Sequence, residues 1–162
     1  MKTKNIIISA LLAALVCVAT MILRIPSPLG GYLNLGDGIV LLCGWLLSPV
    51  YGFLAAGIGS ALADILSGYA LYAPVTFIIK GVMALVAFFI AKGLRSRPLV
   101  SRVAGGITAE IVMIGGYLAF ESFLYGFIPS LVNVPANAVQ GLAGLIIGLL
   151  LINIFEKHHI VN

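Results

Sequence analysis

The stretch IIISALLAALVCVATMIL, residues 6–23, contains no charged side chain and is long enough, at roughly 20 residues per span, to cross a bilayer as a helix. Lysines precede it, as in a secretory signal, but the run is longer than a usual signal core and lacks a clear small-residue cleavage site. We therefore interpret it as a retained transmembrane helix. Of the 162 residues, 62% are hydrophobic and 9% charged, with a mean hydropathy of +1.19, which predicts an integral membrane protein.

Five further apolar stretches follow, separated by Gly, Pro or charged residues that interrupt helices. We expect an all-α integral membrane protein, a compact bundle of six transmembrane helices that forms one domain over residues 1–162. The second helix would be roughly 17 Å long, too short to cross alone, so we expect a loop to extend it or the protein to enclose part of it. The expected helices cover about residues 5–23, 37–47, 49–66, 74–92, 100–123 and 135–155.

The basic residues predict the orientation of this bundle. Seven of the nine lie near the two termini or in one loop, which places both termini in the cytoplasm under the positive-inside rule. Arg24 and Lys80 are the exceptions. The loops around Gly30, Gly68 and Ile128 are then expected on the outer side, and the positive charge indicates orientation rather than binding to nucleic acid. The seven residues are Lys2, Lys4, Lys92, Arg95, Arg97, Arg102 and Lys157.

Small residues recur every four positions in several of the expected helices. Such spacing lets helices approach closely in a membrane, where lipid provides no hydrophobic drive for them to associate. Most of these contacts are expected inside the bundle. Ala10 and Ala14 of the first helix could instead face another membrane subunit, and the pattern leaves both possibilities open.

Polar side chains inside the expected spans are costly, roughly 2.5 to 3.5 kcal/mol for a charge at the helix centre, and therefore informative. Lys80 lies one turn from Thr76, and Glu121 lies at a similar depth. One interpretation is a structural ion pair between Lys80 and Glu121. The other is a pocket for a small polar ring or carboxylate near the outer face, with aromatic walls. The polar group also includes Tyr117, Asn137 and Gln140, and the aromatic candidates are Tyr32, Tyr69, Tyr72 and Phe77.

Four other polar residues admit simpler explanations. Asp37 fits the N-cap of the second helix slightly better than a ligand contact. Asn34, in the loop before it, is open to either interpretation. Asp64 is expected to be solvated or paired with a loop, and Glu110 could serve packing, a proton or a contact with the basic loop.

The sequence contains few groups suited to catalysis. It has no HExxH, Gly-x-Ser-x-Gly or Walker A motif, and its two histidines, His158 and His159, are adjacent near the C-terminal end. We expect no enzyme activity, no cofactor and no bound metal. Energy-driven transport would need a motor from partner subunits, and a ligand-free membrane scaffold or assembly subunit is the alternative function.

Three motifs in order, SALLAAL at 9–15, YLNLGDGIVLL at 32–42 and APVTFIIKG at 73–81, resemble the substrate-binding S component of an energy-coupling factor (ECF) vitamin transporter. The resemblance covers essentially the whole chain and is strongest to proteins assigned to hydroxymethylpyrimidine or pyridoxine.

This resemblance implies a mechanism. The S component binds its vitamin from outside, docks on a transmembrane coupling subunit through Ala10 and Ala14, and tilts in the lipid bilayer to release the vitamin inside, driven by two cytoplasmic ATPases. It also places Asn34, Asp37, Thr76 and Lys80 near the ligand. The full set of expected substrate-binding residues is Asn34, Asp37, Tyr72, Thr76, Lys80, Tyr117, Glu121, Asn137 and Gln140.

Overall fold

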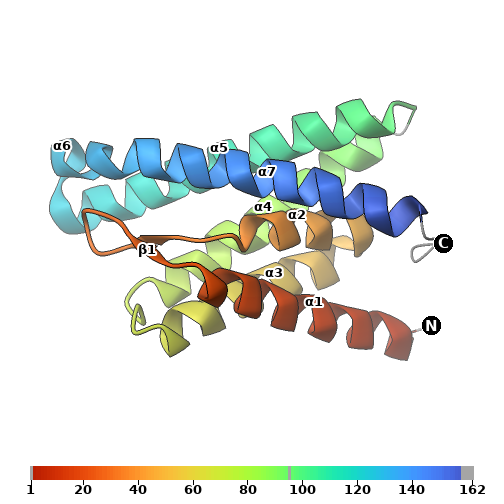
Figure 1. The fold of residues 1–162 in the computed structure, drawn as a ribbon, viewed down its shortest axis with the longest axis horizontal. Helices are drawn as coiled ribbons and strands as arrows, with labels where there is room; N and C mark the ends of the chain where they lie inside the picture. The colour runs from red at the N-terminus through yellow and green to blue at the C-terminus, as the bar shows by residue number, and fades with distance from the viewer. Residues whose placement is uncertain (1, 95, 158–162) are drawn as a thin grey trace.

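The computed structural model describes residues 2–94 and 96–157. Long helices run side by side along the long axis of the molecule, and both ends of the chain lie at the same end of the bundle (Figure 1). The expected fold class, an all-α membrane bundle, is confirmed. Among the described residues, six helices form the bundle: α1 (Lys2–Ile22), α2 (Asp37–Leu46), α3 (Pro49–Leu66), α4 (Ala73–Gly93), α5 (Pro98–Tyr125) and α7 (Val134–Lys157).

Five regions of this bundle are long and apolar enough to cross a membrane, and α2 is the short exception. Most of the residues of α2 are buried, and it packs against α3, α4 and α7. The protein therefore encloses this helix, as expected from its length. Its position matters because its first residue, Asp37, lies deep inside the bundle.

Helix ends follow from residues that cannot continue a helix. Pro49 occupies the first position of α3, where its missing N–H costs nothing. Gly68 and Gly126, with φ of 85° and 90°, follow the ends of α3 and α5 in a conformation that favours glycine. The chain thus reverses direction at both places, and these reversals lie at the end of the bundle opposite the termini (Figure 1).

Two short features of that end differ from the expected irregular loops. Strands β1 (Ile25–Pro26) and β2 (Tyr32–Leu33) form a small antiparallel hairpin, with Ile25 opposite Leu33. The segment after α5 is helical, with α6 (Phe127–Ser130) followed by a 3₁₀ turn, η1 (Leu131–Asn133). This turn directs Ser130 and Asn133 inward, where both are buried.

Small residues allow the helices to meet. A side-chain carbon added at Gly59 would lie 2.4 Å from the carbonyl oxygen of Ala13, and one added at Gly44 would lie 2.5 Å from that of Ala84. Only glycine permits these contacts of α3 with α1 and of α2 with α4. Ala10 and Ala14, by contrast, are exposed on α1.

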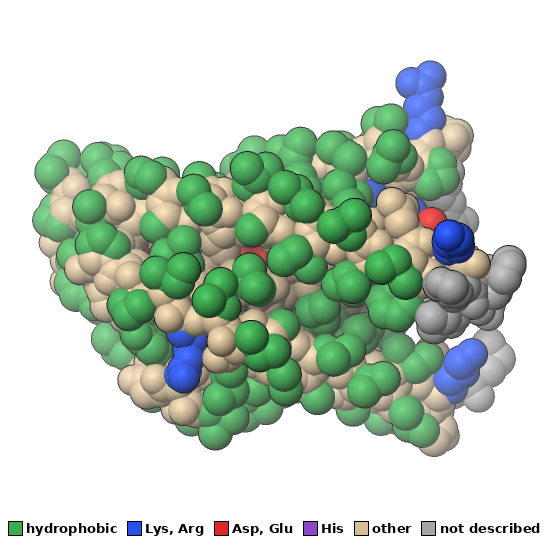
Figure 2. Space-filling model, viewed as in Figure 1, with side chains coloured by type: hydrophobic (Ala, Val, Ile, Leu, Met, Phe, Trp, Pro, Cys, Tyr) green, Lys and Arg blue, Asp and Glu red, His purple; other side chains and the backbone are tan. Residues whose placement is uncertain are grey.

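The distribution of side chains on the surface fits a bundle whose long sides face lipid and whose ends face water. Hydrophobic side chains cover the long sides, while most of the Lys and Arg visible in this view lie at the end that holds the termini (Figure 2). Orientation across the membrane stays a prediction. Arg95, His158 and His159 lie outside the described residues. The basic residues described at this end are Lys4, Lys92, Arg97, Arg102 and Lys157.

Candidate functional site

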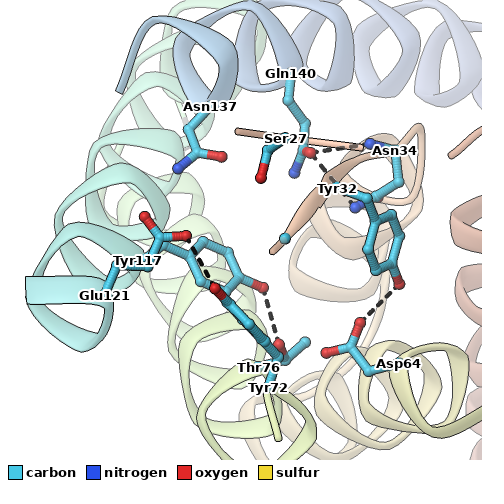
Figure 3. Close-up of a pocket in the computed structure, with 11 residues that line it drawn as sticks. Ser27, Tyr32, Asn34, Asp64, Tyr72, Thr76, Tyr117, Glu121, Asn137 and Gln140 are labelled. Atoms are coloured by element: carbon cyan, nitrogen blue, oxygen red, sulfur yellow. Dashed lines mark hydrogen bonds between the residues drawn. The ribbon is translucent and has the colours of Figure 1, made fainter. Parts of the chain in front are cut away.

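A polar cavity lies at the end of the bundle opposite the termini, between the hairpin and the ends of α3, α4, α5 and α7 (Figure 3). Its free volume is about 30 Å³, room for only one or two water molecules. A larger guest therefore requires side chains or the hairpin to move. The lining residues are Ser27, Gly31, Tyr32, Asn34, Asp64, Tyr72, Thr76, Tyr117, Glu121, Asn137 and Gln140.

The loop that leads into α2 is fixed beside the cavity by amide groups. The Asn34 backbone N–H donates to Gln140 Oε1 at 3.0 Å, and Asn34 Oδ1 accepts from the Gly36 N–H at 2.9 Å. A side-chain carbon at Gly36 would lie 2.0 Å from Thr20 Oγ1, so the turn requires glycine. Asn34 and Gln140, both expected at the site, are thus brought together.

Tyr32 and Asp64 form another wall of the cavity. The Tyr32 hydroxyl donates to Asp64 Oδ1 at 2.7 Å, and the rings of Tyr32 and Tyr69 lie 4.5 Å apart. Asp64 is only 5% exposed, so the expectation of a solvated carboxylate was wrong, whereas pairing with a loop is confirmed. Burial, and then the hydrogen bond to Asp64, raise the pKa of Tyr32, which therefore remains a donor.

On the opposite side of the cavity, Glu121 Oε1 accepts from Asn133 Nδ2 at 2.8 Å and lies 3.5 Å from the Tyr72 hydroxyl. Between the two carboxylates, Thr76 Oγ1 and the Tyr117 hydroxyl are 3.1 Å apart. The sequence-based site did not include Asn133, which reaches Glu121 because the turn before α7 is helical. The only feature of the sequence that could have indicated Asn133 is that it is an amide between apolar residues.

Lys80 lies one turn below Thr76, beneath the cavity, and is 2% exposed. It forms its ion pair with Asp37 Oδ1, so the first of the two interpretations, a structural ion pair with Glu121, was wrong. Asp37 is not the N-cap of α2 either, because Gly36 occupies that position. The Lys80 ammonium also lies 5.6 Å from the centre of the Tyr117 ring, which adds a favourable cation–π contact.

Asp37 is bound by a second group, Gln140 Nε2, which donates to Asp37 Oδ2 at 2.7 Å. Gln140 thereby links the buried ion pair to the Asn34 loop that lines the cavity. Neither Asp37 nor Lys80 lines the cavity itself. The structure places them directly beneath it, where they hold the residues that do.

Glu110 of α5 also lies in this inner region, 6% exposed, with no hydrogen-bond partner for either carboxyl oxygen among the described residues. Side-chain carbons added at Gly141 and Gly144 would lie 3.0 Å and 3.1 Å from its oxygens. The contact with the basic loop is therefore excluded, because Glu110 packs against α7 in the bundle interior. Packing and proton binding remain the open interpretations.

Seven of the nine expected site residues line the cavity together, and Asp37 and Lys80 lie under it. Tyr32, expected as an aromatic wall, also lines the cavity, and Ser27, Gly31 and Asp64 complete the lining, although the sequence-based site omitted these three. The strands of the hairpin are too short to show an alternation of polar and apolar residues, so the sequence does not indicate which of their side chains point inward. The described residues therefore form a polar cavity inside an apolar membrane bundle.

Comparison with known proteins assigns this class. The chain belongs to the family of ECF-type riboflavin transporter S components, whose sequence model matches residues 1–157. S components are the vitamin-binding subunits of transporters, so this chain is a transport subunit rather than a member of an enzyme family. The expected resemblance to ECF S components is confirmed, while the hydroxymethylpyrimidine or pyridoxine assignment stays a prediction.

The chain is also similar to a curated protein and to two solved structures. An uncharacterised Pyrococcus woesei protein from a gap 3′ region is 40% identical over 136 residues, 82% of this chain and 88% of the relative. The S component of a bacterial ECF transporter has the same fold, with a TM-score of 0.80, 27% identity and 98% of each chain covered. An ECF S component for biotin shares the fold at a TM-score of 0.53, with 22% identity and coverage of 92% of this chain and 91% of that one.

Proposed function

We propose that the chain is the substrate-specificity subunit of an ECF-type importer, and that its polar cavity binds a small water-soluble vitamin or vitamin precursor from the extracellular side. The observation that carries this proposal is the cavity itself. Ten hydrogen-bonding side chains converge on one space in an otherwise apolar bundle: Ser27, Tyr32, Asn34, Asp64, Tyr72, Thr76, Tyr117, Glu121, Asn137 and Gln140. A scaffold without a ligand has no use for this concentration of polar groups.

Hydroxymethylpyrimidine and pyridoxine are the favoured substrates. The small free volume, about 30 Å³, suits a single-ring compound better than the three fused rings of a flavin, because less of the cavity must rearrange. Riboflavin is the second candidate, favoured by the family model. The rings of Tyr32, Tyr72 and Tyr117 offer flat apolar surfaces to either kind of ligand.

The binding experiment uses the chain purified in detergent and stripped of ligand by mild unfolding and refolding. Isothermal titration with hydroxymethylpyrimidine, pyridoxine and riboflavin is expected to give saturable one-to-one binding for one of them. Native mass spectrometry of protein purified from rich medium provides an independent test. A protein that binds none of the three and carries no small molecule would support the ligand-free scaffold instead.

Transport also requires partner subunits, and an apolar groove between α1 and α3 fits the coupling subunit. The groove measures about 620 Å³, and Ala10 and Ala14 form part of its wall together with Tyr51, Leu54 and Ile58. Both alanines are exposed, so a partner helix could approach the α1 backbone closely there. Two cytoplasmic ATPases, bound to the coupling subunit, would supply the energy.

Leucine substitutions test this docking surface. Ala10→Leu and Ala14→Leu are each expected to reduce vitamin uptake in cells at least tenfold, while vitamin affinity of the purified chain stays within about twofold, because the groove lies apart from the cavity. Ala119→Leu, on an exposed position of α5, is the matched control and should leave uptake unchanged. Normal uptake by both α1 variants would exclude this groove as the docking surface.

A further inference from the structure

Among the described residues that line it, the cavity has two carboxylates and no cationic side chain to balance them. Asp64 and Glu121 each use one oxygen in the hydrogen bonds described above. The second oxygen of each, Asp64 Oδ2 and Glu121 Oε2, is buried and has no hydrogen-bond partner within residues 2–94 and 96–157. None of the described lining residues is Lys, Arg or His. Lys80, beneath the cavity, already forms an ion pair with Asp37.

The two carboxylates approach the cavity from opposite sides, Asp64 from α3 and Glu121 from α5 (Figure 3). A buried acceptor oxygen without a partner is unfavourable, and a donor supplied by a ligand removes that cost. The phenol rings of Tyr32 and Tyr117 face the space between them, where a flat ring or a cation would be stabilised. The cavity thus has a hydrogen-bond acceptor at each of two opposite ends and aromatic rings between them.

We infer that the cavity selects uncharged or cationic ring compounds that present N–H or O–H donors at two opposite ends, and that it excludes anions such as phosphate esters and carboxylates. The inference rests on the proposed function and narrows its substrate class. An anion entering the cavity would face two carboxylates in a site with little water, and like charges brought together at a desolvated interface are strongly unfavourable. Of the two kinds of ligand expected from the sequence, a small polar ring or a carboxylate, the inference favours the ring.

Matched pairs of ligands test the inference on the purified, ligand-free chain. The pairs are hydroxymethylpyrimidine and its monophosphate, pyridoxine and its 5′-phosphate, and riboflavin and its 5′-phosphate. Whichever parent compound binds, its phosphate ester is expected to bind about 100-fold more weakly. Equal or tighter binding of the ester would overturn the inference while leaving the proposed function intact. Binding of none of the six compounds would instead defeat the proposed function, and the inference with it.

Neutral variants separate charge from size as the cause of this discrimination. Asp64→Asn with Glu121→Gln keeps acceptor oxygens for Tyr32 and Asn133 but removes both charges, so the preference for the parent compound should fall at least tenfold. Glu156→Gln, which removes a carboxylate paired with Arg102 at the other end of the bundle, is the control and should keep the full preference. A full preference in the double variant would mean steric exclusion and overturn the inference. Should that variant fail to fold, each single variant must reduce the preference at least threefold.

Discussion

The two layers of polar residues in this bundle differ in how completely they are bonded. In the inner layer, Lys80 and Gln140 bond both oxygens of Asp37, and Glu110 is the exception there, with no hydrogen-bond partner among the described residues. In the outer layer, around the cavity, Asp64 and Glu121 each keep one buried oxygen without a partner. A satisfied network holds a structure together, whereas unsatisfied acceptors beside a space are suited to a ligand. The network of Lys80, Asp37 and Gln140 is therefore structural, and the outer layer is the place to look for specificity.

Gln140 belongs to both layers. Its amide nitrogen donates to Asp37, and its amide oxygen accepts from Asn34 in the loop beside the cavity. Through Gln140, the buried ion pair of Lys80 and Asp37 is therefore linked to the position of that loop. Changes in the inner layer should mainly alter stability, and changes in the outer layer should mainly alter binding.

The largest expected effect follows from Lys80→Met. This change leaves Asp37, which is fully buried, as an uncompensated charge, and the free energy of unfolding should fall by about 3 to 5 kcal/mol. From the sequence alone, one expects little loss of stability if Lys80 contacts the ligand, and a loss only if Lys80 is half of a structural ion pair with Glu121. Equilibrium unfolding of the ligand-free protein in detergent measures the difference.

The double variant Lys80→Met with Asp37→Asn tests the cause of that loss. Removing both charges together should recover most of the lost stability, because no buried charge is then left unpaired. Lys80→Met with Glu121→Gln, which neutralises the wrong partner, is the matched control and should recover none. Recovery by the control and not by the first pair would contradict the assignment of Asp37 as partner.

A steric change in the inner layer should have an intermediate effect. In Gly144→Ala, the new carbon would lie 2.6 Å from Asp37 Cβ, so α7 must move away from α2. We expect a loss of about 1 to 3 kcal/mol in the free energy of unfolding. Gly115→Ala in α5 has nothing within 4 Å of the new carbon and should be neutral or slightly stabilising. Equal effects of the two substitutions would mean that α2 and α7 are not closely packed.

Much of the fold could be predicted from the sequence because membrane spans leave a strong signal. Long apolar runs show where helices lie, while Pro49 marks the start of α3 and Gly68 marks the turn after its last residues. The hairpin of β1 and β2 and the helical turn of α6 and η1 had no comparable signal. Both are too short to show a periodic pattern of polar and apolar residues, and the hairpin is also held by contacts with α7, distant in the sequence.

The site could be predicted in part for the same reason. Polar residues in a span, such as Thr76 and Gln140, stand out because burial without a partner is costly. Their partners could not be predicted, since depth along a helix does not reveal which helix lies opposite. Lys80 was matched in depth with Glu121, whereas the buried start of the short helix α2 brings Asp37 to it instead. Asn133 and Asp64 were missed or misplaced because they sit at the ends of elements.

The smallest expected effect comes from the outer layer, in Tyr32→Phe. This change removes the donor to Asp64 Oδ1 and should lower the free energy of unfolding by about 0.5 to 1.5 kcal/mol. Tyr69→Phe, which alters the neighbouring ring in the same way, is the control for the loss of a hydroxyl. If Tyr32→Phe costs no more stability than Tyr69→Phe, the bond between Tyr32 and Asp64 contributes nothing.

The pH dependence of the same variant sharpens this comparison, because folding raises the pKa of Tyr32 above its ordinary value of 10.0. A phenol with a raised pKa stabilises the folded state fully while the unfolded chain is still protonated, that is, below pH 10. The stability difference between the wild-type protein and Tyr32→Phe should therefore be constant from about pH 7 to 9 and shrink only above pH 10. A difference that disappears already between about pH 7 and 9 would mean that Tyr32 ionises there, and that the cavity loses its donor to Asp64 near neutral pH.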